Sequence, residues 1–301
     1  ANMVLVRTSM RGAFPSDPAS LAPFDHAIAY VPSMDLYLDG TAQFTGSREL
    51  PAFDRGALAL VVGENGSRLV NLPEPPAEET RRSRQLEATL APNGSASLDM
   101  RIETTGAFAP QWRDRYHSPQ TRRDRLGHDI ASDLPGFEIN PGPTGIETSD
   151  LEDIEKPASV HVRGRAPQFA RREGDDLSVP VAPGERFVAS LATQSQRKLD
   201  IKLRYASVLD DTWTVRIPQG LVAKSLPAPT SGSTPFGSYE VTVERKDNTV
   251  SVHAKVAFRK TRITPAEYPA FLAFCEQADR ALAQRLVVGK PAPAASTTST
   301  H

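Results

Sequence analysis

The sequence predicts a mainly β protein, α+β overall, on three observations. Four short apolar runs are separated by Gly, Pro and Asp turns, as in strands: Met3–Arg7, His26–Val31, Leu36–Leu38 and Ala57–Val62. Two longer stretches, 86–102 and 239–258, alternate apolar and polar residues around the turn sequences PNGS and KDN. A third observation is that only two stretches have helical spacing. The period of two places one face of each strand inward and the other in water.

The two helical stretches carry different signals. Residues 109–134 have large apolar side chains at helical spacing and are interrupted by Pro119, so we expect two short helices inserted between strands. In residues 264–288, Thr264 is expected as the N-cap, with Pro at the first helical position and Glu267 completing a capping box. This pattern predicts a C-terminal helix over 264–288.

Length and composition predict the domain organisation. The chain has 301 residues, of which 39% are hydrophobic and 24% charged, enough for roughly two domains of about 150 residues. We expect residues 1–62 to form one unit and 63–263 a β-rich, antiparallel sandwich-like extension domain. The C-terminal helix follows, and the Pro/Ala/Ser/Thr-rich residues 289–301 are predicted to be a disordered tail.

Charge and cysteine content exclude several classes of function. A net charge of −1 argues against a general nucleic-acid-binding protein, which would be strongly basic. No apolar run approaches the roughly 18 residues of a transmembrane segment, and no signal peptide is visible. A single cysteine allows neither an intrachain disulfide nor a cysteine-rich metal site. We expect no cofactor and no metal.

His26 and Asp39 form the candidate catalytic site. His26 opens one expected strand, and Asp39 ends the next in a Leu-Asp-Gly-Thr turn, thirteen residues later. In such a hairpin the two side chains can share a face, with Asp39 accepting from one imidazole nitrogen and directing the other toward a nucleophile. Spacing alone more often marks a surface histidine or one satisfied in the core, so the assignment depends on geometry.

The only cysteine, Cys275, does not supply this nucleophile. It lies in the middle of the expected C-terminal helix, whereas a reactive thiol needs an environment such as a helix N-terminus that lowers its pKa. Cys275 is therefore predicted to be a packed structural residue.

Three segments resemble the second half of a bacterial transglutaminase-like core, which belongs to the papain-like superfamily of Cys-His-Asp enzymes. They are VLVRT, FDHAIAYVP with LYLDGTA, and LPAFDRGALALVV, within residues 3–62. In that family the His begins a strand and the Asp lies in a W-L-D-x-T type turn. The resemblance implies that His26 is general base and then acid, that Asp39 fixes its tautomer, and that the substrate is an amide bond in a peptide or protein.

The resemblance also implies that part of the enzyme lies outside this chain. The family's catalytic Cys begins a helix upstream of the strand that Met3–Arg7 matches, and Cys275 does not align with it. We therefore expect the C-terminal portion of a longer protein, inert alone, whose partner is the N-terminal portion carrying the Cys. Loss of that helix is expected to uncover an apolar face near Val4, Val6 and Ile28. The family context suggests the periplasm or cell envelope, with the cytoplasm still open.

A second hypothesis assigns no catalysis. Residues 64–262 would form a β-sandwich-like binding or scaffold module of a cell-envelope protein, with the core remnant as its support. A Cys at a helix start upstream of Ala1 would favour the enzyme, and any other residue there would favour the scaffold.

Overall fold

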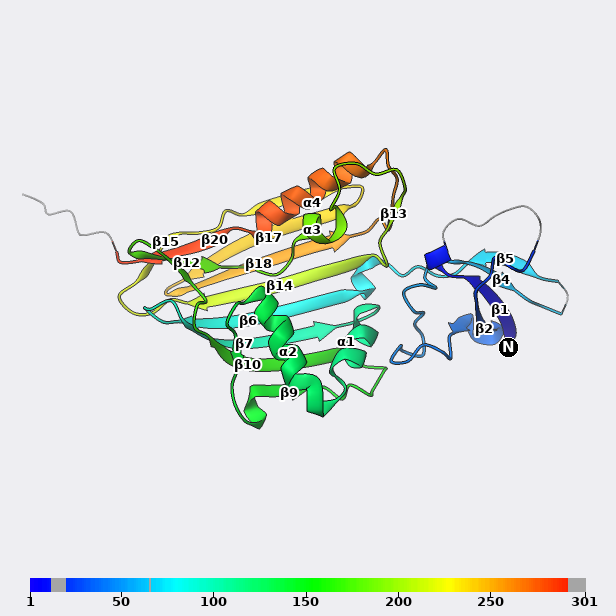
Figure 1. Ribbon diagram of the computed structural model, residues 1–301, viewed down its shortest axis with the longest axis horizontal. Helices are drawn as coiled ribbons and strands as arrows, with labels where there is room; N and C mark the ends of the chain where they lie inside the picture. Colours follow the sequence, from blue (N-terminus) through cyan, green and yellow to red (C-terminus); the bar gives the residue numbers. More distant parts are fainter. Residues whose placement is uncertain (12–19, 65, 292–301) are drawn as a thin grey trace, which may run out of the picture.

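The computed structural model describes residues 1–11, 20–64 and 66–291, and it confirms a mainly β, α+β fold. A small sheet lies at one end of an elongated molecule, and a large sheet covered by helices makes up the remainder (Figure 1). Most of the predicted disordered tail, residues 292–301, lies outside the described residues.

The small sheet has five antiparallel strands in the order β3-β2-β1-β4-β5. Their bounds are β1 (Asn2–Arg7), β2 (His26–Val31), β3 (Leu36–Leu38), β4 (Leu58–Val61) and β5 (Arg68–Asn71). The first four match the predicted strands. Because β5 pairs with β4, this sheet continues beyond the predicted boundary at residue 62.

The expectation of an uncovered face near Val4, Val6 and Ile28 is wrong, because all three side chains are buried. The chain covers this face itself, since Leu50 and Leu72 from the flanking loops belong to the same core cluster. The exposed apolar side chains lie on the reverse face, where Met3 and Leu69 are each more than half exposed.

The large sheet has nine strands, and its main path runs β16-β17-β18-β14-β6-β7-β10-β8, with β9 also paired to β10. All its pairs are antiparallel except the parallel pair of β6 and β14. The bounds are β6 (Arg81–Leu90), β7 (Ala96–Thr104), β8 (Glu138–Ile139), β9 (Ile146–Thr148), β10 (Ala158–Ala166), β14 (Ser207–Arg216), β16 (Thr230–Thr234), β17 (Gly237–Lys246) and β18 (Thr249–Phe258).

Both long hairpins are confirmed, as β6–β7 and β17–β18. In the first turn, the side-chain oxygen of Asn93 accepts hydrogen bonds from the backbone N–H and hydroxyl of Ser95. The residue between them, Gly94, has φ of +91°, a backbone region that favours glycine.

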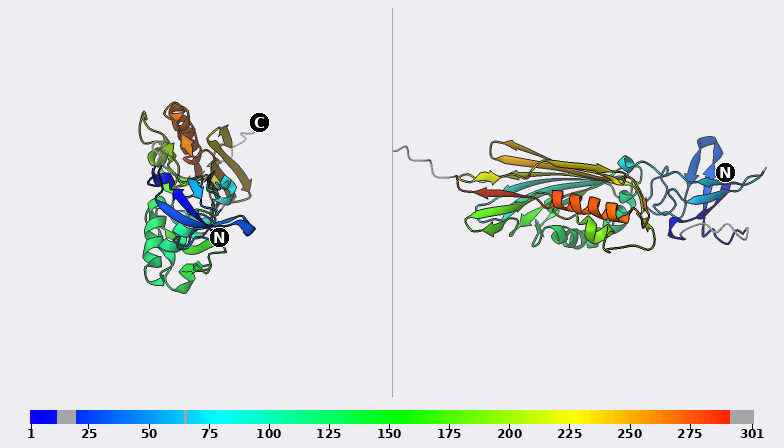
Figure 2. Two further views of the ribbon diagram at one scale, coloured as in Figure 1. Left: turned by 90° about the vertical axis from the view of Figure 1, so that its right-hand side faces the viewer. Right: turned by 90° about the horizontal axis from the view of Figure 1, so that it is seen from above.

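Four helices lie on one face of the large sheet (Figures 1 and 2). They are α1 (Phe108–Tyr116), α2 (Pro119–Asp133), α3 (Phe187–Leu191) and α4 (Tyr268–Leu282). The smaller sheets are β11-β12-β20-β15 and β13-β19. Their bounds are β11 (Arg171–Glu173), β12 (Asp176–Pro180), β13 (Ile201–Lys202), β15 (Val222–Ser225), β19 (Arg262–Ile263) and β20 (Arg285–Gly289). Short 3-10 turns occur at Ser9–Arg11, Pro32–Met34, Ala77–Glu79 and Pro143–Gly145.

The helical predictions are confirmed in one place and corrected in another. The predicted insertion near 109–134 is the pair α1 and α2. The predicted helix 264–288 is too long, because α4 ends at Leu282 and β20 follows it. Leu286 and Val288 are fully buried two positions apart, which is the period of a strand and not of a helix.

The capping interactions before α4 and its apolar face agree with the prediction. The Thr264 backbone N–H donates to the Glu267 carboxylate at 3.1 Å, and the Glu267 N–H lies 3.4 Å from the Thr264 hydroxyl. Cys275 is fully buried in the core of the large sheet. Burial, with a smaller effect of Asp279, raises the pKa of its thiol to about 12, as suits a packed structural residue.

The helices that the structure describes were also compared with the requirements of a membrane span. None combines the length and the apolar character that crossing a bilayer requires.

Candidate functional site

The structure brings His26 and Asp39 together. His26 is the first residue of β2, Asp39 directly follows β3, and these two strands pair in an antiparallel hairpin. The Nε2 atom of His26 lies 3.0 Å from Oδ2 of Asp39, which is hydrogen-bonding distance. No hydrogen bond to Nδ1 of His26 occurs among the residues that the structure describes, so this nitrogen is the one left for a reacting partner.

The turn that follows β3 fixes the carboxylate of Asp39. Its Oδ1 accepts the backbone N–H of Thr41 at 2.9 Å and the Thr41 hydroxyl at 2.7 Å, leaving Oδ2 for His26. Burial acts to raise the pKa of Asp39, but the hydrogen bonds from Thr41 and His26 outweigh it and hold the pKa below 3.8. Asp39 is therefore ionised at neutral pH, as an orienting residue for an imidazole must be.

A second carboxylate, Asp54, belongs to the same site and was missed from the sequence. It lies in the turn region 52–56 and is 0% exposed. Its Oδ2 lies 3.9 Å from Nε2 of His26, and neither carboxylate oxygen has a hydrogen-bond partner among the described residues. Burial raises the pKa of Asp54 to about 7; the charge of His26 opposes this shift and that of Asp39 adds to it.

The loop that carries Asp54 is held by its neighbour Arg55, which is itself buried. The guanidinium donates to the backbone carbonyl of Leu50 at 2.8 Å and to the Thr80 hydroxyl at 3.0 Å. The backbone N–H of Asp54 donates to Pro51. These contacts fix the turn and so fix the position of Asp54 beside His26. The sequence signal that could have found Asp54 is an acidic residue inside the otherwise apolar segment LPAFDRGALAL.

An apolar groove of about 480 Å³ adjoins the site. Phe53, which is 39% exposed, lines it and packs edge-on against the His26 ring with centroids 6.0 Å apart. Thr41, which holds Asp39, lines it as well. Its further apolar lining comes from Met10, Leu50, Ala52, Ala107 and Pro110.

The same three residues were considered as a metal site. Donor atoms of His26, Asp39 and Asp54 all lie within 4.8 Å of one another, a grouping found once among the described residues. The imidazole Nε2 already has a hydrogen-bond partner in Asp39, which completes that pair without a cation. We assign no metal to this site.

The described structure brings no thiol to His26. Cys275 belongs to the core of the large sheet, whereas His26 lies beside the separate core of the small sheet, with Ile28 and Tyr30 following it on the same strand face. The site as described therefore holds a base and its orienter without a nucleophile.

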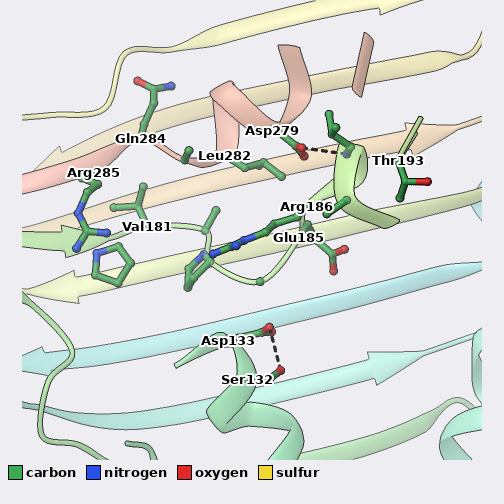
Figure 3. A pocket seen from close by; sticks show the side chains of 17 residues that line it. Ser132, Asp133, Val181, Glu185, Arg186, Thr193, Asp279, Leu282, Gln284 and Arg285 are labelled. Atoms are coloured by element: carbon green, nitrogen blue, oxygen red, sulfur yellow. Dashed lines mark hydrogen bonds between the residues drawn. The ribbon is translucent and has the colours of Figure 1, made fainter. Parts of the chain in front are cut away.

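A larger cavity, about 1060 Å³, lies under the helices of the large sheet (Figure 3). Its wall is built from three separate segments of the chain, which include Ser132 and Asp133, residues 180–186, and Asp279 with residues 282–285. The Asp279 carboxylate accepts the N–H groups at the start of α3, at 2.7 and 3.0 Å. Because its lining residues come together only in the folded chain, no local motif in the sequence predicts this cavity.

Three comparisons place parts of the chain beside known proteins. Residues 175–288 match the family model described as "Domain of Unknown Function with solved-structure structure (DUF3858)". This match runs through most of the extension domain, including α4, and leaves the His26 site outside it. No curated protein matches the chain.

Among solved structures, the chain is similar to a crystal structure from Parabacteroides distasonis described as a "putative protease". The similarity has a TM-score of 0.46 and 14% identity, and it covers 95% of this chain and 39% of that one. The chain thus spans about two fifths of that protein's length. A TM-score below 0.5 carries no argument about function.

Proposed function

We propose that this chain is the C-terminal part of a transglutaminase-like cysteine enzyme that cleaves or exchanges amide bonds. The observation that carries the proposal is the 3.0 Å contact between His26 Nε2 and the Asp39 carboxylate, with Nδ1 left unengaged among the described residues. The resemblance of the segments around both residues supports the choice of a cysteine nucleophile. That nucleophile belongs to a segment outside this sequence, which is the expected partner of the chain.

The chemistry follows from the tautomer that Asp39 selects. Because ionised Asp39 accepts the Nε2 proton, the lone pair of neutral His26 is on Nδ1. Nδ1 takes the thiol proton, and the thiolate attacks the amide carbonyl carbon to form a tetrahedral intermediate. The Nδ1 proton then passes to the leaving amine as the C–N bond breaks. Water or a second amine, deprotonated by Nδ1, releases the acyl group and restores the thiol.

The reverse face of the small sheet is the place where we expect the upstream segment to pack. Its apolar side chains Met3, Val62 and Leu69 are exposed in this chain, and soluble proteins rarely leave large contiguous apolar patches uncovered. We also propose a cell-envelope location, on the family resemblance alone.

The experiment measures the reactivity of the upstream thiol and needs no substrate. In the full-length protein, the rate of alkylation by iodoacetamide is followed from pH 5 to 9. A thiolate paired with the His26 imidazolium should react at pH 6, and His26→Gln should lower that rate at least about tenfold, because an unperturbed thiol has a pKa near 8.5.

The control is His128→Gln, which alters an exposed histidine of α2 and should leave the rate unchanged. Equal rates at pH 6 in the wild type and in His26→Gln, or an upstream segment without a cysteine, would contradict the proposal.

A second candidate function, a non-catalytic binding module, is favoured by the 1060 Å³ cavity of the extension domain. Its lining carries both signs of charge, for example Glu185 and Arg186, as a site for a polar ligand would. Under this hypothesis the upstream segment has no reactive thiol, so the alkylation experiment separates the two candidates.

A further inference from the structure

Two carboxylates face the same nitrogen of His26. Asp39 alone satisfies Nε2 and fixes the tautomer, at 3.0 Å. Asp54 is a second acidic group, 3.9 Å from the same nitrogen and on a different segment of the chain. An orienting role for Asp39 leaves the presence of Asp54 unexplained.

No other described cation compensates the charge of Asp54. The guanidinium of Arg55, the next residue, points to the carbonyl of Leu50 and to Thr80, with Glu49 at 3.4 Å. Asp25, the residue before His26, is bonded to Thr8 and Arg11 and adds only further negative charge near the site. The titratable groups that act on Asp54 are therefore His26, Asp39 and, more weakly, Asp25.

A fully buried carboxylate without donors is costly when it is ionised, and it avoids that cost by binding a proton or by facing a positive charge. Both options are present here. Asp54 can hold a proton while His26 is neutral, or it can be ionised while His26 is an imidazolium at 3.9 Å. With Asp39 ionised, the three groups carry a net charge of −1 in either state.

We propose that Asp54 is a positioning residue that shares a single proton with His26, so that the imidazolium form of His26 is paired with ionised Asp54 and the neutral form with protonated Asp54. The pKa of about 7 given to Asp54 by its burial supports this coupling, because it lies in the range where imidazoles titrate.

The consequence for catalysis rests on the proposed function. The resting form of a cysteine–histidine pair is a thiolate beside an imidazolium. Ionised Asp54 adds a second negative charge next to Nε2 and so favours the imidazolium over the neutral ring. Asp54 would thereby increase the fraction of reactive thiolate without contacting the thiol or the substrate.

The test uses the present 301-residue chain and does not depend on activity. Histidine ring nitrogens are labelled with ¹⁵N and aspartate carboxyl carbons with ¹³C, and both are followed by NMR from pH 4 to 9. In the wild type, His26 and Asp54 should titrate with shared midpoints. In Asp54→Asn, His26 should titrate in one step with at least about tenfold lower proton affinity, since opposite charges 4 Å apart interact strongly even near a surface.

Two variants make the assignment and the control. His26→Gln identifies the His26 signals by their loss. Asp35→Asn makes the same change of charge on the small sheet, at a residue that bonds to Tyr30 and not to His26, and it should leave the His26 midpoint in place.

The outcome that overturns the proposal is an unchanged His26 titration in Asp54→Asn. If that variant does not fold, the wild-type spectrum decides: a carboxyl carbon of Asp54 that titrates in one step near pH 4, independently of His26, also overturns it. Neither result bears on the upstream thiol, so this proposal and the proposed function can fail separately.

Discussion

Each of the two regions of the molecule buries an aspartate, and the two are treated in opposite ways. Asp211 on β14 is buried in the large sheet and lies 2.5 Å from Arg84 and 3.4 Å from Arg82. Asp54 beside the small sheet is buried more completely and has no hydrogen-bond partner among the described residues. Burial is the same in both regions, and what differs is the supply of donors.

The difference separates a structural charge from a chemical one. Asp211 joins two arginines of the neighbouring strand β6, and this network continues to Asp133 on α2 and to Glu185, so it links the sheet to its covering layer. Asp54 links nothing and faces an imidazole at 3.9 Å. A buried acid that no donor stabilises lowers the stability of the fold, which is acceptable where a titrating group is useful.

The largest effect is expected where the charge is paired. Asp211→Asn removes the shared acceptor of Arg82 and Arg84 and leaves two buried guanidinium groups short of negative charge. Breaking a buried ion pair from one side costs about 4 kcal/mol, measured as the free energy of unfolding in urea at pH 7. A loss below about 1 kcal/mol would show that Asp133 and Glu185 suffice for both arginines and would weaken the comparison.

The unpaired aspartate should behave oppositely. The pKa of Asp54 is raised from 3.8 to about 7 by folding, so the folded protein binds a proton there that the unfolded chain has released. Wild-type stability therefore falls, through this group, as the pH rises from about 4 to about 7, and the loss is complete above that range. Asp54→Asn lacks this loss and should be more stable than the wild type at pH 8.

The expected gain for Asp54→Asn at pH 8 is on the order of 3 kcal/mol, from about 1.4 kcal/mol for each unit of pKa shift. It should shrink to nothing near pH 4, where Asp54 is protonated in both states. Urea unfolding of both proteins at pH 4, 6 and 8 measures it. A variant that is less stable than the wild type at pH 8 would show that Asp54 has a stabilising partner outside the described contacts.

The sequence predicted the parts of this comparison that depend on local pattern. His26 and Asp39 follow from strand alternation and a turn thirteen residues apart, and the hairpins follow from their Asn-Gly and Lys-Asp-Asn turns. The end of α4 was placed wrongly because residues 285–289 are too few for their alternation to be distinguished from a helical repeat.

The two buried acids were not predictable, because each depends on a contact between distant segments. The network of Asp211 requires the parallel pairing of β14 with β6, whose residues are 127 positions apart at the Arg84–Asp211 contact. Asp54 becomes part of the site only when its turn closes onto the first residue of β2. Parallel pairing and loop closure leave no periodic signal in the sequence.

A smaller effect is expected at the turn that holds the catalytic carboxylate. Thr41→Ala removes the hydroxyl that donates to Asp39 at 2.7 Å and keeps the backbone bond at 2.9 Å. Because the folded-state pKa of Asp39 is lowered, the stability it contributes is present at neutral pH and is lost as the pH falls through that pKa. The variant should lose about 1.5 kcal/mol at pH 7 and less near pH 2.

The comparison variant for this turn is Thr45→Ala, a nearby threonine that also lines the apolar groove and has no printed bond to the carboxylate of Asp39. It should unfold within about 0.5 kcal/mol of the wild type, as surface substitutions usually do. Equal losses in both variants would mean that the groove, and not the carboxylate, accounts for the effect.

The smallest effect comes from the same turn chemistry without a charge. Asp39-Gly40-Thr41 and Asn93-Gly94-Ser95 have matching bonds: in each, the side-chain oxygen of the first residue accepts the N–H and the hydroxyl of the third. The acceptor is an ionised carboxylate beside the small sheet and a neutral amide in the β6–β7 hairpin. Hydrogen bonds to charged acceptors are roughly twice as strong as neutral ones.

Ser95→Ala should therefore cost about 0.5 kcal/mol, clearly less than Thr41→Ala, and its cost should not vary between pH 4 and 8 because no titrating group takes part. Urea unfolding of the two variants side by side measures this difference. If Ser95→Ala cost as much as Thr41→Ala, the charge on Asp39 would contribute nothing to its turn. The bonds from Thr41 would then be ordinary turn contacts, and the lowered pKa of Asp39 would have to come from His26 alone.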